Sequence, residues 1–236
     1  MNAARATSDD ASIFLQDLAA HSLQKTVDGY QQAIQMVLDL KLRRVPSAVA
    51  TTLHPRAYTN KQIDLLCTNT ADRMRLSIKI AQLGGLRAHE LDTISAPEEM
   101  KEDARPWLKE RFIGRKGVRY IVAGKGGLRR AVMLDFEIAA SLEELRLPLP
   151  VVKKEREINY VKRFGLIGGQ EFSRKFTDLS NAVLGWSTGA HGLRHRFAQD
   201  RIQYLQLEGF YFQNALEIVA QELGHFSTKN TLSYLR

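Results

Sequence analysis

The sequence predicts a mainly α-helical protein that carries one small antiparallel β-sheet, which places it in the α+β class. Apolar residues recur at helical spacing along most of the chain. Between Phe112 and Leu134 the spacing changes, because two β-rich runs there flank a turn with the sequence Gly124-Lys125-Gly126-Gly127. The length of 236 residues and the 44% hydrophobic content allow one good core with a small helical domain beside it.

Composition narrows the kinds of partner and cofactor. A formal charge of +8 favours an anionic partner, although the charges are scattered and an ordinary basic protein has the same composition. Cys67 is the single cysteine, so an internal disulfide is excluded, and no Cys/His cluster has zinc spacing. The first ten residues lack the apolar run of a signal peptide, and no stretch is long enough to span a membrane. We therefore expect a cytoplasmic protein without metal, cofactor or membrane association.

Residues 1–50 predict a separate helical module. Ser8, followed by two aspartates, is a candidate cap for a helix that reaches about His21. Thr26 is the candidate cap of a second helix. From Leu42 to Thr59 the apolar period is lost around two prolines, and this segment is predicted to be a linker. The second helix is predicted to have one apolar face, formed by Tyr30, Ile34, Val37 and Leu38.

Helices and a hairpin are predicted after the linker. One helix begins at Asn60, and the next is closed by Gly84-Gly85. The runs Val118–Ala123 and Arg129–Leu134 are predicted strands joined by the glycine-rich turn, and Arg111–Ile113 is a candidate third strand. From Asp135 to its end the chain is predicted to be helical, with interruptions at Pro148, Pro150 and the Gly168-Gly169 pair.

Two basic residues near turns are candidates for binding or catalysis. Arg87 precedes Glu90 by three positions, so the glutamate can hold the guanidinium if a helical turn forms there. An arginine of this kind, taken alone, is usually a surface ion pair. Lys125 lies in the hairpin turn, where a flexible ammonium can reach into a groove and protonate a leaving oxygen, although a lone lysine at a turn is usually just solvated. The turn is not a P-loop, because it lacks that spacing and leads into a strand.

Three histidines, a second arginine and a tyrosine complete the candidate set. His191 and Arg194 are three residues apart, so they face the same side of a helix that starts near His191. His195 has the spacing of a helical metal pair with His191, but no HExxH glutamate and no third ligand accompany them, which favours a supporting or packing role. His225 follows Leu223-Gly224, and Tyr234 stands nine positions later. Taken singly, these two are an ordinary helix-end histidine and a packing aromatic.

The chain resembles the tyrosine recombinase, or phage integrase, family in its motifs and in their order. The motifs are GLRAHEL, then a hairpin lysine, then HGLRH, then LGH with a tyrosine nine residues after its histidine. The resemblance covers residues 58–236, which match the catalytic domain of the family. Residues 1–50 resemble part of its helical core-binding, DNA-binding domain. The resemblance implies a catalytic set supported by Glu90 and His195, and this set consists of Arg87, Lys125, His191, Arg194, His225 and Tyr234.

The chemistry implied by the resemblance suits these residue types. Two arginines, Arg87 and Arg194, would bind the non-bridging oxygens of a DNA phosphate through planar paired donors. Because a tyrosine hydroxyl with a pKa of about 10 is mostly protonated at neutral pH, its attack needs a proton acceptor, and His191 is the candidate. Lys125 would protonate the departing 5′ oxygen, and His225 would bind the phosphate. The product is a 3′-phosphotyrosyl enzyme, which a 5′ hydroxyl of another duplex can reverse without ATP or metal.

Three features depart from the family pattern. Gly84-Gly85 stands where many members have Thr-Gly, and the stretch between Arg87 and Lys125 is long, which indicates an insertion around Pro97–Pro106. The chain ends at Arg236, two residues after Tyr234, where many members continue into a tail. This end and the short first module make us expect a further arm-binding domain outside the chain.

Double-stranded DNA and a homotetramer on paired sites are the partners that the resemblance implies. The target sequence, and the choice between integrase, resolvase and transposase roles, do not follow from the chain. One alternative enzyme is a type IB topoisomerase, which has a similar site but reseals the same strand. Another alternative is a DNA-binding regulator with a disused site, against which the presence of all six residue types argues.

Overall fold

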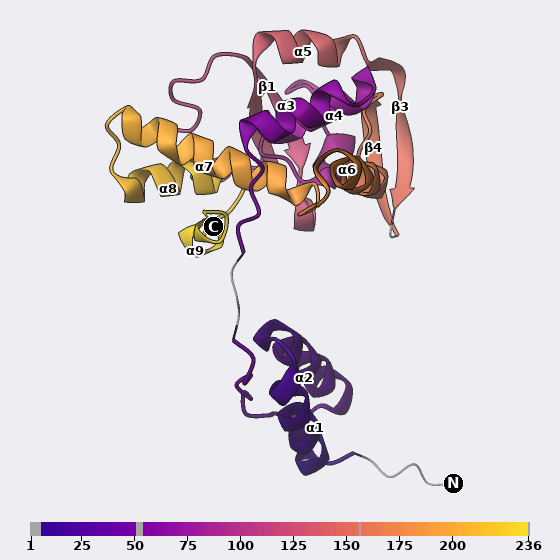
Figure 1. Ribbon diagram of the computed structural model, residues 1–236, viewed down its shortest axis with the longest axis vertical. Coiled ribbons are helices and arrows are strands. Elements are labelled where there is room, and N and C mark those ends of the chain that lie inside the picture. Colours follow the sequence, from indigo (N-terminus) through magenta and orange to yellow (C-terminus); the bar gives the residue numbers. More distant parts are fainter. Residues whose placement is uncertain (1–5, 51–53, 156, 236) are drawn as a thin grey trace. The chain divides into compact units, whose positions relative to one another are not determined.

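The computed structural model describes residues 6–50, 54–155 and 157–235, and of Lys125 it describes the backbone but not the side chain. The chain forms two compact units, Met1–His54 and Pro55–Arg236 (Figure 1). The first unit is built around two helices and the second around helices and two small sheets. Each unit has its own cluster of buried apolar side chains.

The first unit contains α1 (Ser8–His21) and α2 (Gln24–Leu38). The predicted end of α1 at His21 is confirmed, but both predicted caps are wrong. Thr7 caps α1 instead of Ser8, because the Asp10 amide donates to the Thr7 hydroxyl at 3.2 Å while Asp10 accepts from the Thr7 amide at 2.9 Å. This reciprocal pair satisfies two free amides of the first turn, which Ser8 does not. Thr26 lies inside α2.

The apolar face predicted for α2 is mostly exposed. Tyr30 and Val37 are 51% and 75% exposed, whereas Val27 and Gln31 are buried. Gln31 is buried because its amide donates to the carbonyl of Leu42 at 3.1 Å and accepts from the amide of Val45 at 3.4 Å. The start of the predicted linker is therefore packed on the two helices, and its Leu42 and Val45 side chains contact their small core.

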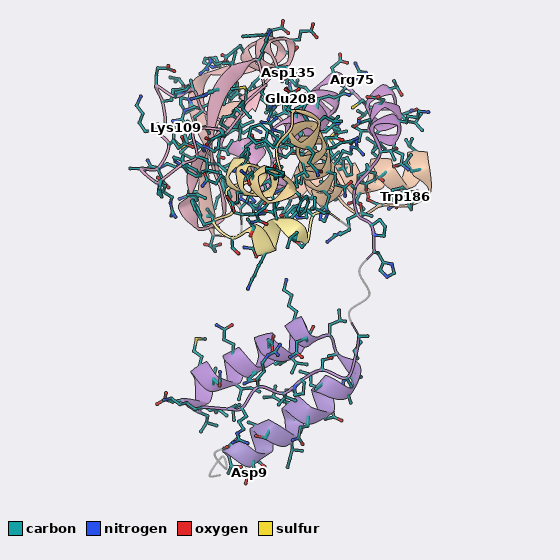
Figure 2. All side chains as sticks on the ribbon, turned by 90° about the vertical axis from the view of Figure 1, so that its left-hand side faces the viewer. Asp9, Arg75, Lys109, Asp135, Trp186 and Glu208 are labelled. Carbon is teal, nitrogen blue, oxygen red and sulfur yellow. The ribbon has the colours of Figure 1, made fainter. Side chains whose placement is uncertain are left out.

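The second unit begins with α3 (Asn60–Thr68) and α4 (Asp72–Leu83), as predicted. Tyr58, assigned to the linker by the sequence, is completely buried and stacks on Trp186 with ring centroids 5.2 Å apart. Its hydroxyl accepts from the amide of Thr188 at 2.8 Å. The segment before α3 is therefore attached to the loop that precedes residue 191. Trp186 lies at the edge of the unit (Figure 2).

The predicted hairpin forms with the predicted bounds. Strands β1 (Val118–Ala123) and β2 (Arg129–Leu134) pair antiparallel, with Lys125–Gly127 as the 3-10 turn η2 between them. The third strand predicted at Arg111–Ile113 is wrong, because residues 109–114 form turns and Phe112 has a φ of 65°. The ring of Phe112 packs under the hairpin against Ile121, Ala131 and Met133.

A second hairpin corrects the prediction that the chain is helical beyond Asp135. Strands β3 (Arg146–Glu155) and β4 (Ile158–Phe164) pair antiparallel, so the described residues form two small sheets instead of the one predicted. The prolines at 148 and 150 do not prevent this strand, because the register shifts between Arg146 and Val151 and regular pairing starts at Val151. The apolar and β-branched residues of this segment favour a strand, but the two prolines led to the prediction of an interruption in a helical region.

The segment predicted as an insertion, around Pro97–Pro106, runs without a helix or strand in the described residues from Ala96 to Gly117. It packs on the end of α8, where the amide of Leu108 donates to the side chain of Gln221 at 2.6 Å. Trp107 contacts Phe226 with ring centroids 5.4 Å apart. Lys109 points outward at the edge of the unit (Figure 2).

The remaining helices place the C-terminal residues. Helices α7 and α8 lie side by side, with α9 next to α8 (Figure 1). Their shared core includes Phe197, Leu216, Val219 and Tyr234. Among the helices of the described residues, none is both long and apolar enough to cross a membrane. The bounds are η1 (Ala88–Asp92), α5 (Phe136–Glu143), α6 (Gly169–Leu184), α7 (His191–Leu207), α8 (Phe212–Glu222) and α9 (Thr228–Leu232).

We expect Gly85→Ala to destabilise the protein more than Gly185→Ala. Both glycines have positive φ, at 59° and 79°, so an alanine at either position costs about 1 kcal/mol in backbone strain. At Gly85 an added Cβ would also meet Phe197 Cδ1 at 2.6 Å, whereas at Gly185 nothing lies within 4 Å. Overpacking adds about 1–3 kcal/mol at Gly85. Urea denaturation of both variants measures the difference, and equal losses would contradict the close packing.

Candidate active site

The turn after α4 positions Arg87 and Glu90. Gly85 takes a left-handed conformation that turns the chain into η1. Because a 3-10 turn places residues three apart directly above one another, the Arg87 guanidinium reaches Glu90. Arg87 Nη1 donates to Glu90 Oε1 at 2.9 Å, and the Arg87 amide donates to Glu90 Oε2 at 2.9 Å. The contact predicted between these two residues is confirmed.

The Glu90 carboxylate is completely buried among three guanidinium groups. Besides Arg87, Arg130 Nη2 donates to Glu90 Oε2 at 2.8 Å, and Arg194 Nη1 lies 3.7 Å from the same oxygen. Burial alone would raise the pKa of Glu90, but the charges of Arg130, Arg194 and Arg87 lower that pKa to about 2. Glu90 is therefore ionised at neutral pH, and three positive groups face one negative group.

Arg194 is held in one orientation from the first turn of α7. Its Nη1 donates to the carbonyl of Gly85, its Nη2 donates to the carbonyl of Leu223 at 2.5 Å, and its Nε donates to the Tyr234 hydroxyl at 3.4 Å. The side chain is completely buried, and burial lowers the pKa of Arg194 to about 10, so the guanidinium stays charged at neutral pH. Arg87, with 26% of its side chain exposed, is the more accessible of the two predicted arginines.

His225 lies between the two arginines. Its Nε2 is 3.3 Å from Arg87 Nη2 and 3.2 Å from Arg194 Nη2, and its Nδ1 is 3.0 Å from the hydroxyl of Thr231. Guanidinium groups only donate, so Nε2 must accept, which assigns the ring proton to Nδ1 and makes Thr231 its acceptor. Burial, with the charges of Arg194 and Arg87, lowers the pKa of His225 to about 3. The imidazole is therefore neutral at neutral pH.

Tyr234 follows the short helix α9 and lies within the cluster of histidines. Its ring centroid is 4.6 Å from that of His195, 5.2 Å from that of His191 and 5.3 Å from that of His225. The residue is 7% exposed, and its backbone amide donates to the Thr231 carbonyl at 2.9 Å. The hydroxyl faces Arg194 of the same chain. Direct access of another group to Arg194 Nε therefore requires Tyr234 to move.

His191 is the first residue of α7, as predicted. Burial and the nearby charge of Arg194 lower the pKa of His191 to about 3, so its imidazole is neutral at neutral pH. The structure thus gathers five of the six predicted residues and both supporting ones around a single point. The sixth, Lys125, lies in the η2 turn, and its side chain is outside the described part of the chain.

Sequence reasoning missed Arg130 and assigned no role to Thr231. Arg130 lies in β2 immediately before the buried run Ala131–Leu134. A charged residue next to an apolar strand run is the sequence pattern that could have indicated a buried, paired arginine. Thr231 stands three residues before Tyr234, which places both on one side of a helical turn.

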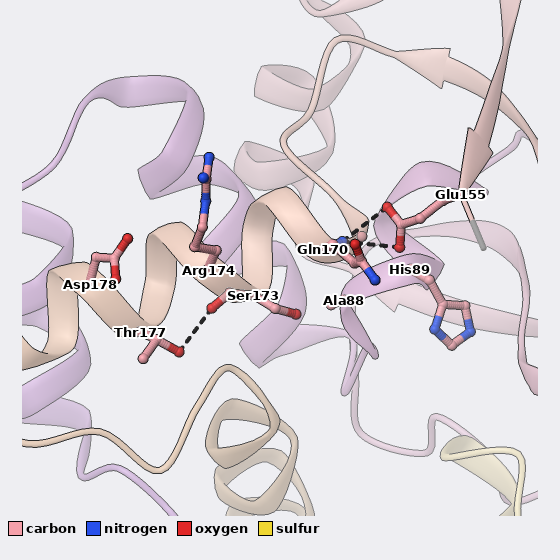
Figure 3. Close-up of a pocket in the computed structure, with 9 residues that line it drawn as sticks. Ala88, His89, Glu155, Gln170, Ser173, Arg174, Thr177 and Asp178 are labelled. Atoms are coloured by element: carbon pink, nitrogen blue, oxygen red, sulfur yellow. Dashed lines mark hydrogen bonds between the residues drawn. The ribbon is translucent and has the colours of Figure 1, made fainter.

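A separate cavity of about 480 Å³ lies beside η1 and runs along α6 (Figure 3). Glu155 lies over the start of α6, where both carboxylate oxygens accept from the amide of Gln170 at 3.1 and 3.0 Å. His89 lines this cavity, although it is only two residues along the chain from Arg87, which belongs to the cluster around Glu90. Among the described residues, no group of three or more His, Cys, Asp and Glu side chains is arranged to hold a metal ion.

No protein-family model matches the chain, and no curated protein matches it. Solved structures do. A XerH site-specific recombinase bound to palindromic difH substrate, in a post-cleavage complex, is 19% identical with a TM-score of 0.61 over 98% of this chain and 67% of that chain. The integrase of the Tn1549 transposon, in complex with circular intermediate DNA, is 12% identical with a TM-score of 0.56 over 98% of this chain and 81% of that chain.

A lambda integrase tetramer bound to a Holliday junction is 15% identical with a TM-score of 0.54, over 97% of this chain and 64% of that chain. The chain therefore spans about two thirds of the length of the XerH and lambda integrase chains. At these identities the likeness concerns the fold. The predicted fold class is confirmed, since the helical body with small antiparallel sheets has the tyrosine recombinase catalytic fold.

The neutral buried histidines predict how stability depends on pH. An unfolded histidine has a pKa near 6.5, whereas that of folded His225 is about 3, so between these values the unfolded chain binds a proton that the folded chain does not. The free energy of unfolding therefore falls as pH decreases below about 6.5, by roughly 1 kcal/mol per pH unit for each such histidine. Glu90 changes the free energy of unfolding only at lower pH, because the stabilisation that its carboxylate contributes is fully present above its unfolded pKa of 4.5.

Urea denaturation between pH 7 and pH 5 measures this slope. We expect the free energy of unfolding of His225→Gln to depend less steeply on pH, by the contribution of one histidine. The glutamine amide oxygen can still accept from the arginines. Identical slopes for the native chain and the variant would show that His225 is not held neutral.

Proposed function

We propose that this protein is a tyrosine-type site-specific DNA recombinase, which cleaves and rejoins DNA strands through a 3′-phosphotyrosyl intermediate. The observation that carries the proposal is the cluster around Glu90. Three guanidinium groups share one buried carboxylate, and the hydroxyl of Tyr234 lies 3.4 Å from Arg194 Nε. Excess positive charge in a water-poor site favours an anion, and a tyrosine in contact with that charge can act on the anion as a nucleophile.

The proposed roles follow from the positions of the groups. Arg87, which is partly exposed, would bind a non-bridging oxygen of the scissile phosphate first. Arg194 would bind the second oxygen once Tyr234 moves from its Nε toward the phosphorus. Neutral His191, whose ring lies 5.2 Å from that of Tyr234, is the proposed proton acceptor. A bound phosphate would raise the low pKa of His191, which strengthens it as a base when substrate is present.

His225 is proposed to change its hydrogen bonds during the reaction. In the structure its Nε2 accepts from two arginines, so it carries no proton to give to a phosphate. The negative charge of a bound phosphate would raise the pKa of His225 and favour the form that donates. Thr231 would accept from the other nitrogen, Nδ1, throughout the reaction, which keeps the His225 ring attached to the helix that precedes Tyr234. Lys125 is proposed to protonate the departing 5′ oxygen from the hairpin turn.

The two units would divide the work on DNA. We assign Pro55–Arg236 the catalytic role and Met1–His54 the role of a partial core-binding module. Double-stranded DNA is the proposed substrate, and a homotetramer on paired sites is the proposed assembly. The lambda integrase structure on a Holliday junction, which is a tetramer, supports this assembly. The net charge of +8 agrees with a polyanionic substrate.

A covalent adduct with DNA tests the proposal. A suicide duplex, nicked near the cleavage site so that the released fragment diffuses away, would come from the ends of the element that encodes the protein. We expect the native chain to form an adduct that survives denaturing electrophoresis, and Tyr234→Phe to form none while it still binds the duplex. Recombined duplexes on uncut substrates would then support recombination, whereas relaxed circles alone would indicate a topoisomerase. Tight binding without an adduct from the native chain would favour a regulator.

Delivery of the nucleophile in cis is a second expected outcome. Tyr234 contacts Arg194 of its own chain, which supports a site built within one chain. We expect a mixture of Tyr234→Phe and Arg87→Ala chains to form no adduct, because neither chain has a complete site. A mixture of native and Tyr234→Phe chains serves as the control and should form adduct in proportion to the native share. Adduct from the first mixture would establish exchange of Tyr234 between subunits.

A further inference from the structure

We propose that Arg130, a residue without an assigned role, is a positioning residue that sets the spacing of Arg87 and Arg194 by holding the Glu90 carboxylate and the end of α8. The proposal rests on the recombinase function proposed above. Arg130 is 1% exposed, so it is not a direct contact for substrate in this arrangement. Any effect on the reaction must pass through the groups that it touches.

Arg130 joins three segments that are distant in sequence. Its Nη2 donates to Glu90 Oε2 at 2.8 Å and to the Gly85 carbonyl at 3.4 Å, and its Nη1 donates to the Glu222 carbonyl at 2.6 Å. Glu90 belongs to η1, Gly85 to the turn after α4, and Glu222 to the last turn of α8. The planar guanidinium fixes these partners in one geometry, which the single ammonium of a lysine does not.

The two oxygens of Glu90 have different guanidinium partners, although Oε2 also accepts from the Arg87 backbone amide. Oε1 accepts from Arg87, while Oε2 accepts from Arg130 at 2.8 Å and lies 3.7 Å from Arg194 Nη1. The difference between these distances shows that Arg130 is the main guanidinium partner of Oε2. Without Arg130, Oε2 would take Arg194 as its partner and draw that guanidinium away from Tyr234 and the Leu223 carbonyl. Arg130 thus keeps Arg194 available for another anion.

The glycine of the Leu223-Gly224-His225 motif makes room for Arg130. Gly224 has a φ of 73°, and a Cβ there would lie 2.8 Å from Arg130 Cδ. The arginine therefore passes directly against the backbone that carries His225. Loss of its volume and charge would loosen this turn, which moves His225 relative to Arg87 and Arg194. The same side chain consequently influences both the arginines and the histidine.

The test compares Arg130→Met, Arg130→Lys and the control Arg111→Met. Arg111 forms another ion pair, with Glu102 at 2.7 Å, and its side chain is 9% exposed, but it lies in the segment before β1 and outside the cluster. Methionine keeps most of the volume at either position. The measured quantities are duplex affinity and the single-turnover cleavage rate at saturating suicide duplex, each corrected for the folded fraction. A purely structural loss changes the folded fraction and leaves the corrected rate unchanged.

We expect Arg130→Met to bind the duplex within about threefold of native and to cleave it at least tenfold more slowly. Arg130→Lys should recover part of the rate, because it keeps the charge beside Glu90, and Arg111→Met should cleave within twofold of native. A corrected rate for Arg130→Met within twofold of native would overturn the proposal.

A measurement without DNA separates this proposal from the recombinase function. The imidazole resonances of His225, recorded at pH 7 in each variant, report its position between the arginines. We expect them to shift in Arg130→Met, to return toward native in Arg130→Lys and to stay unchanged in Arg111→Met. Unchanged resonances in Arg130→Met would overturn the positioning role even if the native chain cleaves DNA. Shifted resonances in a protein that forms no adduct would support that role while the recombinase function fails.

Discussion

The buried Glu90 carboxylate is the constraint on which the rest of the site depends. An ionised carboxylate without water is costly unless positive groups and hydrogen bonds surround it. Its partners come from the turn after α4, from β2 and from α7, so these elements must meet at one place for the charge to be tolerated. The carbonyls of Gly85, Glu222 and Leu223 accept further hydrogen bonds from Arg130 and Arg194. Satisfying one buried charge therefore assembles the site.

The same arrangement leaves the site prepared for an anion. Three guanidinium groups around one carboxylate leave positive charge in excess, and that charge acts with burial to keep His191 and His225 neutral. A phosphate would reverse this effect, since its negative charge favours the protonated forms. In the proposed mechanism, neutral His191 would then accept the tyrosine proton more readily. In the proposed mechanism, charge balance would link binding of the phosphate to proton transfer.

Local patterns in the sequence were sufficient to predict the features that depend on residues close together along the chain. The contact of Arg87 with Glu90, the start of α7 at His191 and the bounds of the β1–β2 hairpin all follow from spacing within a few residues. Arg130 was missed because its partners lie 40 and 92 residues away. The β3–β4 hairpin was missed because its prolines imitate a loop. The apolar face of α2 was misjudged because the returning segment around Leu42 decides which side is covered.

In the proposed mechanism Tyr234 leaves Arg194 before a phosphate binds there, and the contacts of the C-terminal helices favour movement of α9. Helices α7 and α8 share a buried core, and Arg130 and Arg194 fasten the end of α8 from inside. By contrast, α9 has five residues, and Leu232 within it is 47% exposed. The His225 to Thr231 hydrogen bond joins this short helix to the arginines. A phosphate that takes the arginine donors away from His225 would leave the hydrogen bond to Thr231 in place, so that His225 would stay joined to α9 while Tyr234 leaves Arg194.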